Sequence, residues 1–112
     1  MRLPCEISVK FVLPTIRSIL AYQLFHHYSL NQEEIAERLG VTQPAVSQYL
    51  KGIRGKKIQL VMKNKKIMEM IDELANLIAT KPLEENLIDE KICKICKIVR
   101  EELGYGRRVR NS

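Results

Sequence analysis

Gln43, Ser47 and Gln48 are short polar residues that share one face of a predicted helix. If Val46, Tyr49 and Leu50 face inward at about 100° per residue, these three side chains face outward. A helix that is merely solvated usually carries Glu and Lys on this face. A glutamine amide can pair bidentately with adenine, and a serine hydroxyl can donate or accept a hydrogen bond. The outward face is therefore typical of a helix that contacts the edges of bases.

A basic block follows this helix directly. Between Lys51 and Lys66 the chain has no acidic residue, whereas in residues 67–90 seven acidic residues stand against Lys81 alone. The basic residues of the block are Lys51, Arg54, Lys56, Lys57, Lys63, Lys65 and Lys66. A cluster of this kind beside a base-reading helix is an electrostatic footprint for phosphates. The alternative is a charged face that only contacts water.

The cysteines are a second set of residues with possible chemistry. Cys93 and Cys96 form a C-x-x-C pair, and Cys5 lies near the other end of the chain. An i,i+3 spacing on a helix puts both thiols on one side, close enough to bind the same metal ion. Cys5 supplies a third ligand if the termini meet, and His26, His27, a carboxylate or water would have to be the fourth. The alternative is that Cys96 is simply a small buried apolar residue.

Two short helices joined by a tight turn must position the outward amides. Asn31 can cap the first helix, and Glu34 can complete a capping box. Gly40 lies where the chain leaves this helix, and glycine accepts the left-handed conformation that such an exit often needs. Thr42 can cap the second helix, and Pro44 is tolerated in its first turn. The segment 32–51 is therefore predicted to be a helix-turn-helix.

This segment resembles the lambda-repressor-like helix-turn-helix family of DNA-binding proteins, whose second helix contacts bases in the major groove. The resemblance implies an all-α DNA-binding domain and a set of DNA contacts. The predicted DNA-binding residues are Thr42, Gln43, Pro44, Ser47, Gln48, Lys51, Arg54, Lys56 and Lys57. The chain is also similar to small archaeal regulators that carry an amino-terminal Pro-Cys-Glu and a carboxy-terminal C-x-x-C. That second resemblance implies an iron–sulfur cluster or zinc held by Cys5, Cys93 and Cys96.

Three longer helices are predicted around the helix-turn-helix. Residues 15–27 form a backing helix, and Lys81–Pro82 separates two amphipathic helices over 60–79 and 83–103. Their apolar stripes are too wide for lone helices in water. We expect them to supply a dimer interface made of Ile67, Ile71, Leu74, Ile78, Ile88, Ile92, Ile95 and Val99. The alternative is that both helices complete the core of one chain.

Length and composition fit a small soluble regulator. The chain has 112 residues and a formal net charge of +6, with 46% hydrophobic residues to build a core. We expect a helix-turn-helix domain over residues 1–58 and a helical extension for dimerisation or sensing over 59–112. No apolar run has the length of a membrane span, and no signal peptide is apparent, so a cytoplasmic location is expected. No phosphate-binding loop, catalytic carboxylate pair or nucleophile–base arrangement predicts an enzyme.

Together these observations predict a homodimeric transcription regulator, a repressor that binds double-stranded DNA at a roughly palindromic operator. Metal or redox responsiveness would come from the cysteines. The alternative is an antitoxin-like protein-interaction module that also binds DNA. Co-purification with a second protein would favour the antitoxin, whereas colour or bound metal would favour a sensor.

Overall fold

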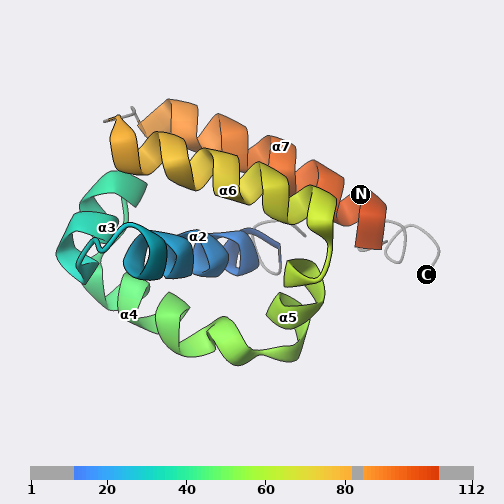
Figure 1. Cartoon of the computed structure of the whole chain (residues 1–112), viewed down its shortest axis with the longest axis horizontal. Coiled ribbons are helices and arrows are strands. Elements are labelled where there is room, and N and C mark those ends of the chain that lie inside the picture. The colour runs from blue at the N-terminus through green and yellow to red at the C-terminus, as the bar shows by residue number, and fades with distance from the viewer. Residues whose placement is uncertain (1–11, 82–84, 104–112) are drawn as a thin grey trace, which may run out of the picture.

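The computed structural model describes residues 12–81 and 85–103, and every regular element within those ranges is helical (Figure 1). The elements are α2 (Leu13–His27), α3 (Gln32–Leu39), α4 (Gln43–Lys51), the 3-10 turn η2 (Gly52–Arg54), α5 (Lys56–Met62), α6 (Lys65–Thr80) and α7 (Glu85–Leu103). The predicted all-α class, a helix-turn-helix followed by carboxy-terminal helices, is confirmed. The break at Pro14 also predicts a short helix or an extended piece over residues 6–13, which lies almost entirely outside the described ranges.

Helix α2 occupies the centre of the molecule. Figure 1 shows it between the side-by-side pair α6–α7 and the row formed by α4 and α5. Pro14 lies in its first turn, where a missing amide costs no intrahelical hydrogen bond. Its apolar residues Ile16, Ile19, Leu20 and Leu24 are all fully buried, because neighbouring helices cover α2 on more than one side. The backing helix predicted over 15–27 is therefore present.

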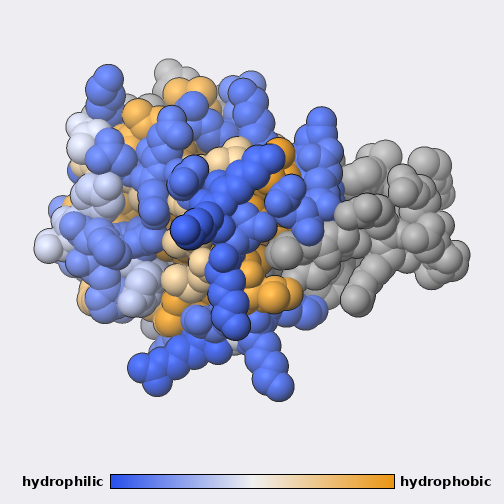
Figure 2. Space-filling model, turned by 45° about the vertical axis from the view of Figure 1, so that its right-hand side comes forward, coloured by the Kyte–Doolittle hydropathy of each residue, from blue (hydrophilic) through white to orange (hydrophobic). Residues whose placement is uncertain are grey.

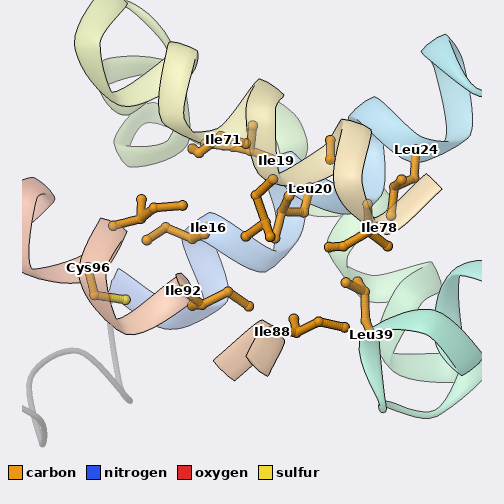
Figure 3. Packing of buried hydrophobic residues seen from close by; sticks show 14 of the residues in the cluster. Ile16, Ile19, Leu20, Leu24, Leu39, Ile71, Ile78, Ile88, Ile92 and Cys96 are labelled. Carbon is orange, nitrogen blue, oxygen red and sulfur yellow. The ribbon is translucent and has the colours of Figure 1, made fainter. Parts of the chain in front are cut away.

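The buried residues form one continuous core. Figure 3 shows side chains of α2 meeting Ile71 and Ile78 of α6, and Ile88 and Ile92 of α7. The residues predicted to form a dimer interface, namely Ile67, Ile71, Leu74, Ile78, Ile88, Ile92, Ile95 and Val99, are all buried within this single chain. Their predicted place on a subunit surface was therefore wrong, because α2 already covers both apolar stripes. The alternative, in which α6 and α7 complete the core of one chain, describes the structure.

The helix predicted over 60–79 is interrupted. It is divided into α5 and α6 at Lys63–Asn64, because the Asn64 side chain caps α6. The Asn64 Oδ1 accepts a hydrogen bond from the Ile67 amide at 3.0 Å. Helical spacing over 60–79 predicts that Leu60 belongs to the apolar stripe, but Leu60 lies on α5 and is 51% exposed. On α7, helical spacing also predicts that Leu87 faces inward, but Leu87 is 39% exposed.

Polar contacts join the helix-turn-helix to the carboxy-terminal helices. The Arg38 guanidinium of α3 donates to the Ile78 carbonyl oxygen at 2.7 Å, near the end of α6. The Gln23 amide of α2 donates to the Asp72 carboxylate at 2.7 Å. The two parts predicted as 1–58 and 59–112 therefore share both a core and polar contacts. Among the described helices, none combines the length and apolarity needed to cross a membrane.

Candidate nucleic-acid interface

The turn between α3 and α4 is built as the sequence predicts. The Asn31 Oδ1 accepts from the Glu34 amide at 2.8 Å, and Glu34 Oε1 accepts from the Asn31 amide at 2.9 Å. This reciprocal pair is a capping box, and it fixes the start of α3. Gly40 ends the helix at φ 71°, in the left-handed region that favours glycine. The Val41 amide then donates to the Ala36 carbonyl oxygen at 3.0 Å, which closes the turn.

Helix α4 is held in place by packing of its inner face against the core and by a cap at its amino end. Thr42 Oγ1 accepts a hydrogen bond from the Ala45 amide at 3.2 Å, so Thr42 caps the helix. Val46 is completely buried, while Tyr49 and Leu50 are partly buried against the same core. The inward face predicted from helical spacing is therefore correct. One face of α4 is fixed by packing, which orients the opposite face.

The outer face of α4 carries the predicted base-contacting residues. Gln43, Pro44 and Gln48 are exposed, and so is Lys51 at the end of the helix. Ser47 is half-buried, so it is less accessible than the two glutamines. No acidic residue occurs in α4, so nothing on this helix repels a phosphate. The face presents hydrogen-bonding groups without a negative charge.

A hydrogen bond joins the first residues of the two helices. Gln43 Nε2 donates to Gln32 Oε1 at 2.8 Å. This contact limits the rotamers of Gln43, and it leaves the Gln43 oxygen and the Gln32 amino group available for other partners. The sequence prediction did not include Gln32. Its signal was the repeated glutamine at the first position of each helix, but sequence spacing alone does not show that the two helix starts meet.

The basic residues continue from the end of α4. Lys51, Arg54, Lys56 and Lys57 lie on the last turn of α4, on η2 and at the start of α5, and all four are exposed. Along the chain, these exposed basic residues follow directly after the outward amides of α4. Phosphates flank the bases in a DNA groove, so this arrangement suits backbone contacts beside the base contacts.

The two described cysteines lie in different environments. Cys93 is exposed, whereas Cys96 is 2% exposed and belongs to the core cluster (Figure 3). Helix α7 is rotated so that Cys96 shares the buried stripe with Ile92 and Val99, which supports the packing interpretation of Cys96. Across residues 12–81 and 85–103, no three His, Cys, Asp or Glu side chains group as metal ligands would. Cys5 lies outside the described residues, so its predicted approach to Cys93 and Cys96 stays a prediction.

Comparison with known proteins also identifies a helix-turn-helix in this part of the chain. The family model described as "Helix-turn-helix" matches residues 27–63, about a third of the chain, in agreement with the predicted lambda-repressor-like segment. This match includes α3, the turn, α4 and α5. It does not include the Pro-Cys-Glu and C-x-x-C segments, on which the similarity to archaeal regulators depends. No curated protein and no solved structure matches the chain.

Proposed function

We propose that the protein is a sequence-specific DNA-binding transcription regulator in which α4 enters the major groove. The main observation behind this proposal is that the two faces of α4 differ. Its inner face is fixed by Val46 and the Thr42 cap, while its outer face presents amides and no acidic group. The helix-turn-helix family match over the same residues supports it. A helix oriented by its scaffold can discriminate bases without first paying an ordering cost.

Base contacts and phosphate contacts are divided between two groups of residues. Gln43 and Gln48 contact base edges, with Ser47 as a shorter-range partner. Lys51, Arg54, Lys56 and Lys57 contact phosphates and fix the position of the protein on the duplex. Thr42 and Pro44 lie at the amino end of α4. They determine how this helix begins, and they approach the DNA backbone.

We further propose that the protein acts as a homodimeric repressor in the cytoplasm, on a roughly palindromic operator. One recognition helix contacts only a few base pairs, and two-fold symmetry doubles the site. Since the stripes of α6 and α7 are buried, the interface must use exposed side chains. Leu60 is a candidate, because it is the most exposed of the large hydrophobic residues described and lies on α5, close in sequence to α4.

The test is selection of bound duplexes from a random library, followed by sedimentation of the protein with the selected DNA. We expect enriched sequences with inverted half-sites about 34 Å apart, which is one turn of B-DNA, and two protein chains on each duplex. Recovery of no preferred sequence would contradict base-specific binding. A single chain on each selected duplex would contradict the dimer but leave sequence-specific binding intact. If the protein co-purifies with a second protein that covers α4, the antitoxin-like alternative is favoured.

Metal or redox responsiveness through Cys5, Cys93 and Cys96 stays a prediction. Anaerobic purification followed by metal analysis and an absorption spectrum tests it directly. Stoichiometric iron or zinc that is lost in Cys93→Ser would support a sensor. Absence of metal, with operator binding by Cys96→Ser unchanged by oxygen, would leave the cysteines without that role.

A further inference from the structure

A surface groove lies between α2 and the segment that follows α4. Its apolar lining comes from Tyr22 and Phe25 of α2, Leu50 of α4, Ile53 of η2 and Met62 of α5, and its volume is about 700 Å³. Sites for small organic ligands are usually concave, mostly apolar and roughly 300–1,000 Å³ in volume. This groove has the size of such a site, and its lining combines these apolar side chains with polar and charged ones.

The rings that form the aromatic wall of the groove contact one another, and the wall is partly open to solvent. The ring of His26 lies 4.3 Å from that of Tyr22 and 5.1 Å from that of Phe25, measured between centroids. Phe25 is nevertheless 39% exposed, among the most exposed of the large hydrophobic residues described. On the other side, Gln59 Nε2 donates to the Ile53 carbonyl oxygen at 2.9 Å, which ties α5 to η2. An apolar group entering the groove would cover Phe25 without having to open the fold.

The charged groups that line the groove are all positive. Lys51 and Arg54 contribute to it, both are exposed, and no acidic side chain is among its described lining residues. On the face of the molecule seen in Figure 2, hydrophilic side chains cover much of the surface, with apolar residues showing between them. An occupant of this groove therefore needs an apolar body and a negative charge.

We propose that this groove binds a small amphipathic anion, with an aromatic or aliphatic body and a carboxylate or similar acidic group. The body covers Phe25 and Met62, and the anionic group pairs with Lys51 and Arg54. These two basic residues are also proposed phosphate contacts, so the ligand and DNA compete for them. This regulatory step rests on the proposed function. A second copy of the chain fits less well, because two-fold pairing of grooves would bring Lys51 and Arg54 toward the same cations of the partner.

The ligand site is tested with 1-anilinonaphthalene-8-sulfonate, a fluorescent aromatic anion. N-phenyl-1-naphthylamine, which has the same ring body without the sulfonate, is the matched neutral probe. We expect one saturable site for the anion, with an affinity at least about tenfold above that of the neutral probe, because charged groups near a protein surface interact with appreciable energy. Equal affinities for the two probes would overturn the proposed role of charge.

Matched variants locate the site. Lys51→Gln combined with Arg54→Gln should weaken binding of the anionic probe about tenfold, whereas Lys65→Gln with Lys66→Gln removes the same charge outside the groove and should change it little. Phe25→Ala should also weaken it, unlike Leu87→Ala on α7, a site of equal exposure. Circular dichroism confirms that each variant is folded, and Phe25→Leu replaces Phe25→Ala if that variant is not. Unchanged affinity in both groove variants would overturn the site, as would an affinity that falls when protein concentration rises, which indicates a second copy in the groove.

Competition is measured with a mixed-sequence duplex at low salt. The probe should weaken DNA binding, and DNA should weaken probe binding by the same factor, because thermodynamic coupling is reciprocal. Phe25→Ala should keep its DNA affinity but lose its response to the probe. If DNA binds equally well with and without the probe, the competition is wrong and the proposed function stands. If no duplex is bound at all, the proposed function and the competition fall together, while the probe affinities still decide whether the groove binds an anion.

Discussion

At the scale of residues, the two outward amides of α4, Gln43 and Gln48, differ in how they are held. Gln43 is restrained by its hydrogen bond to Gln32, whereas Gln48 makes no such bond within the described part of the chain. We expect Gln43→Ala and Gln48→Ala each to cost about 1–3 kcal/mol on the selected operator and little on random DNA. Fluorescence anisotropy with both duplexes measures the difference. Equal losses on the two DNAs would argue against base contacts.

The variant Gln32→Ala tests whether Gln32 orients the Gln43 side chain or contacts DNA itself. It removes the partner of Gln43 but none of the predicted base contacts, so we expect a smaller loss of operator affinity than for Gln43→Ala. The double variant should be no weaker than Gln43→Ala alone, because both changes remove the same interaction. Additive losses would show that Gln32 contacts DNA by itself.

The basic residues after α4 make a different prediction, about salt. Neutralising Lys51, Arg54, Lys56 and Lys57 to Gln should weaken binding to all sequences. Each lost phosphate contact should reduce the slope of log K against log salt by about 0.9. Titrations at several salt concentrations give the slope. An unchanged slope in the quadruple variant would remove these residues from the interface.

At the scale of elements, Arg38 connects the helix-turn-helix to the end of α6. It donates to the Ile78 carbonyl oxygen at 2.7 Å from a partly buried position. We expect Arg38→Ala to lower the free energy of unfolding by about 1.5–3 kcal/mol, as for other hydrogen bonds to charged groups. Arg54→Ala, which removes an exposed arginine from η2, is the control and should leave stability nearly unchanged. Urea denaturation measures both, and equal effects would contradict the role of Arg38.

The ion pair between Arg17 and Asp89 should behave differently from Arg38. Its atoms are 3.8 Å apart, and the Asp89 side chain is 58% exposed. Water screens such a pair, so its contribution to stability is expected to be small. The connection between α2 and α7 therefore depends on apolar packing more than on this charge pair.

Local signals predicted the helix-turn-helix accurately. The capping box, the left-handed Gly40 and the Thr42 cap depend on residues within four positions of each other, and each is present. The break at Asn64 was missed, because an asparagine in an apolar stripe fits both a helix interior and a cap. The partner of the apolar stripes on α6 and α7 was also predicted wrongly. Periodicity shows that a face is apolar, but it does not show whether α2 or a second chain covers it.

At the scale of the whole molecule, one core should give one unfolding transition. Ile16 of α2 and Ile92 of α7 are both fully or almost fully buried in it. We expect Ile16→Ala and Ile92→Ala each to cost about 2–5 kcal/mol, and Leu60→Ala to cost far less because Leu60 is half exposed. Hydrogen exchange should show α3 and α4 losing protection with α7. If Ile92→Ala leaves the protection of α3 and α4 unchanged, the two parts fold separately.

Because α2 lies at the centre of the molecule, the proposed DNA-contacting segment depends on it and is not expected to fold correctly in another protein. The family match begins at residue 27, where α2 ends, so a fragment cut to the matched length loses the helix on which α4 rests. Ile35, Leu39 and Val46 would then face water instead of the core. Transplanting residues 27–63 into another protein is therefore expected to fail. New target preferences are better engineered by exchanging the outward side chains of α4 in the intact chain, which leaves the buried face untouched.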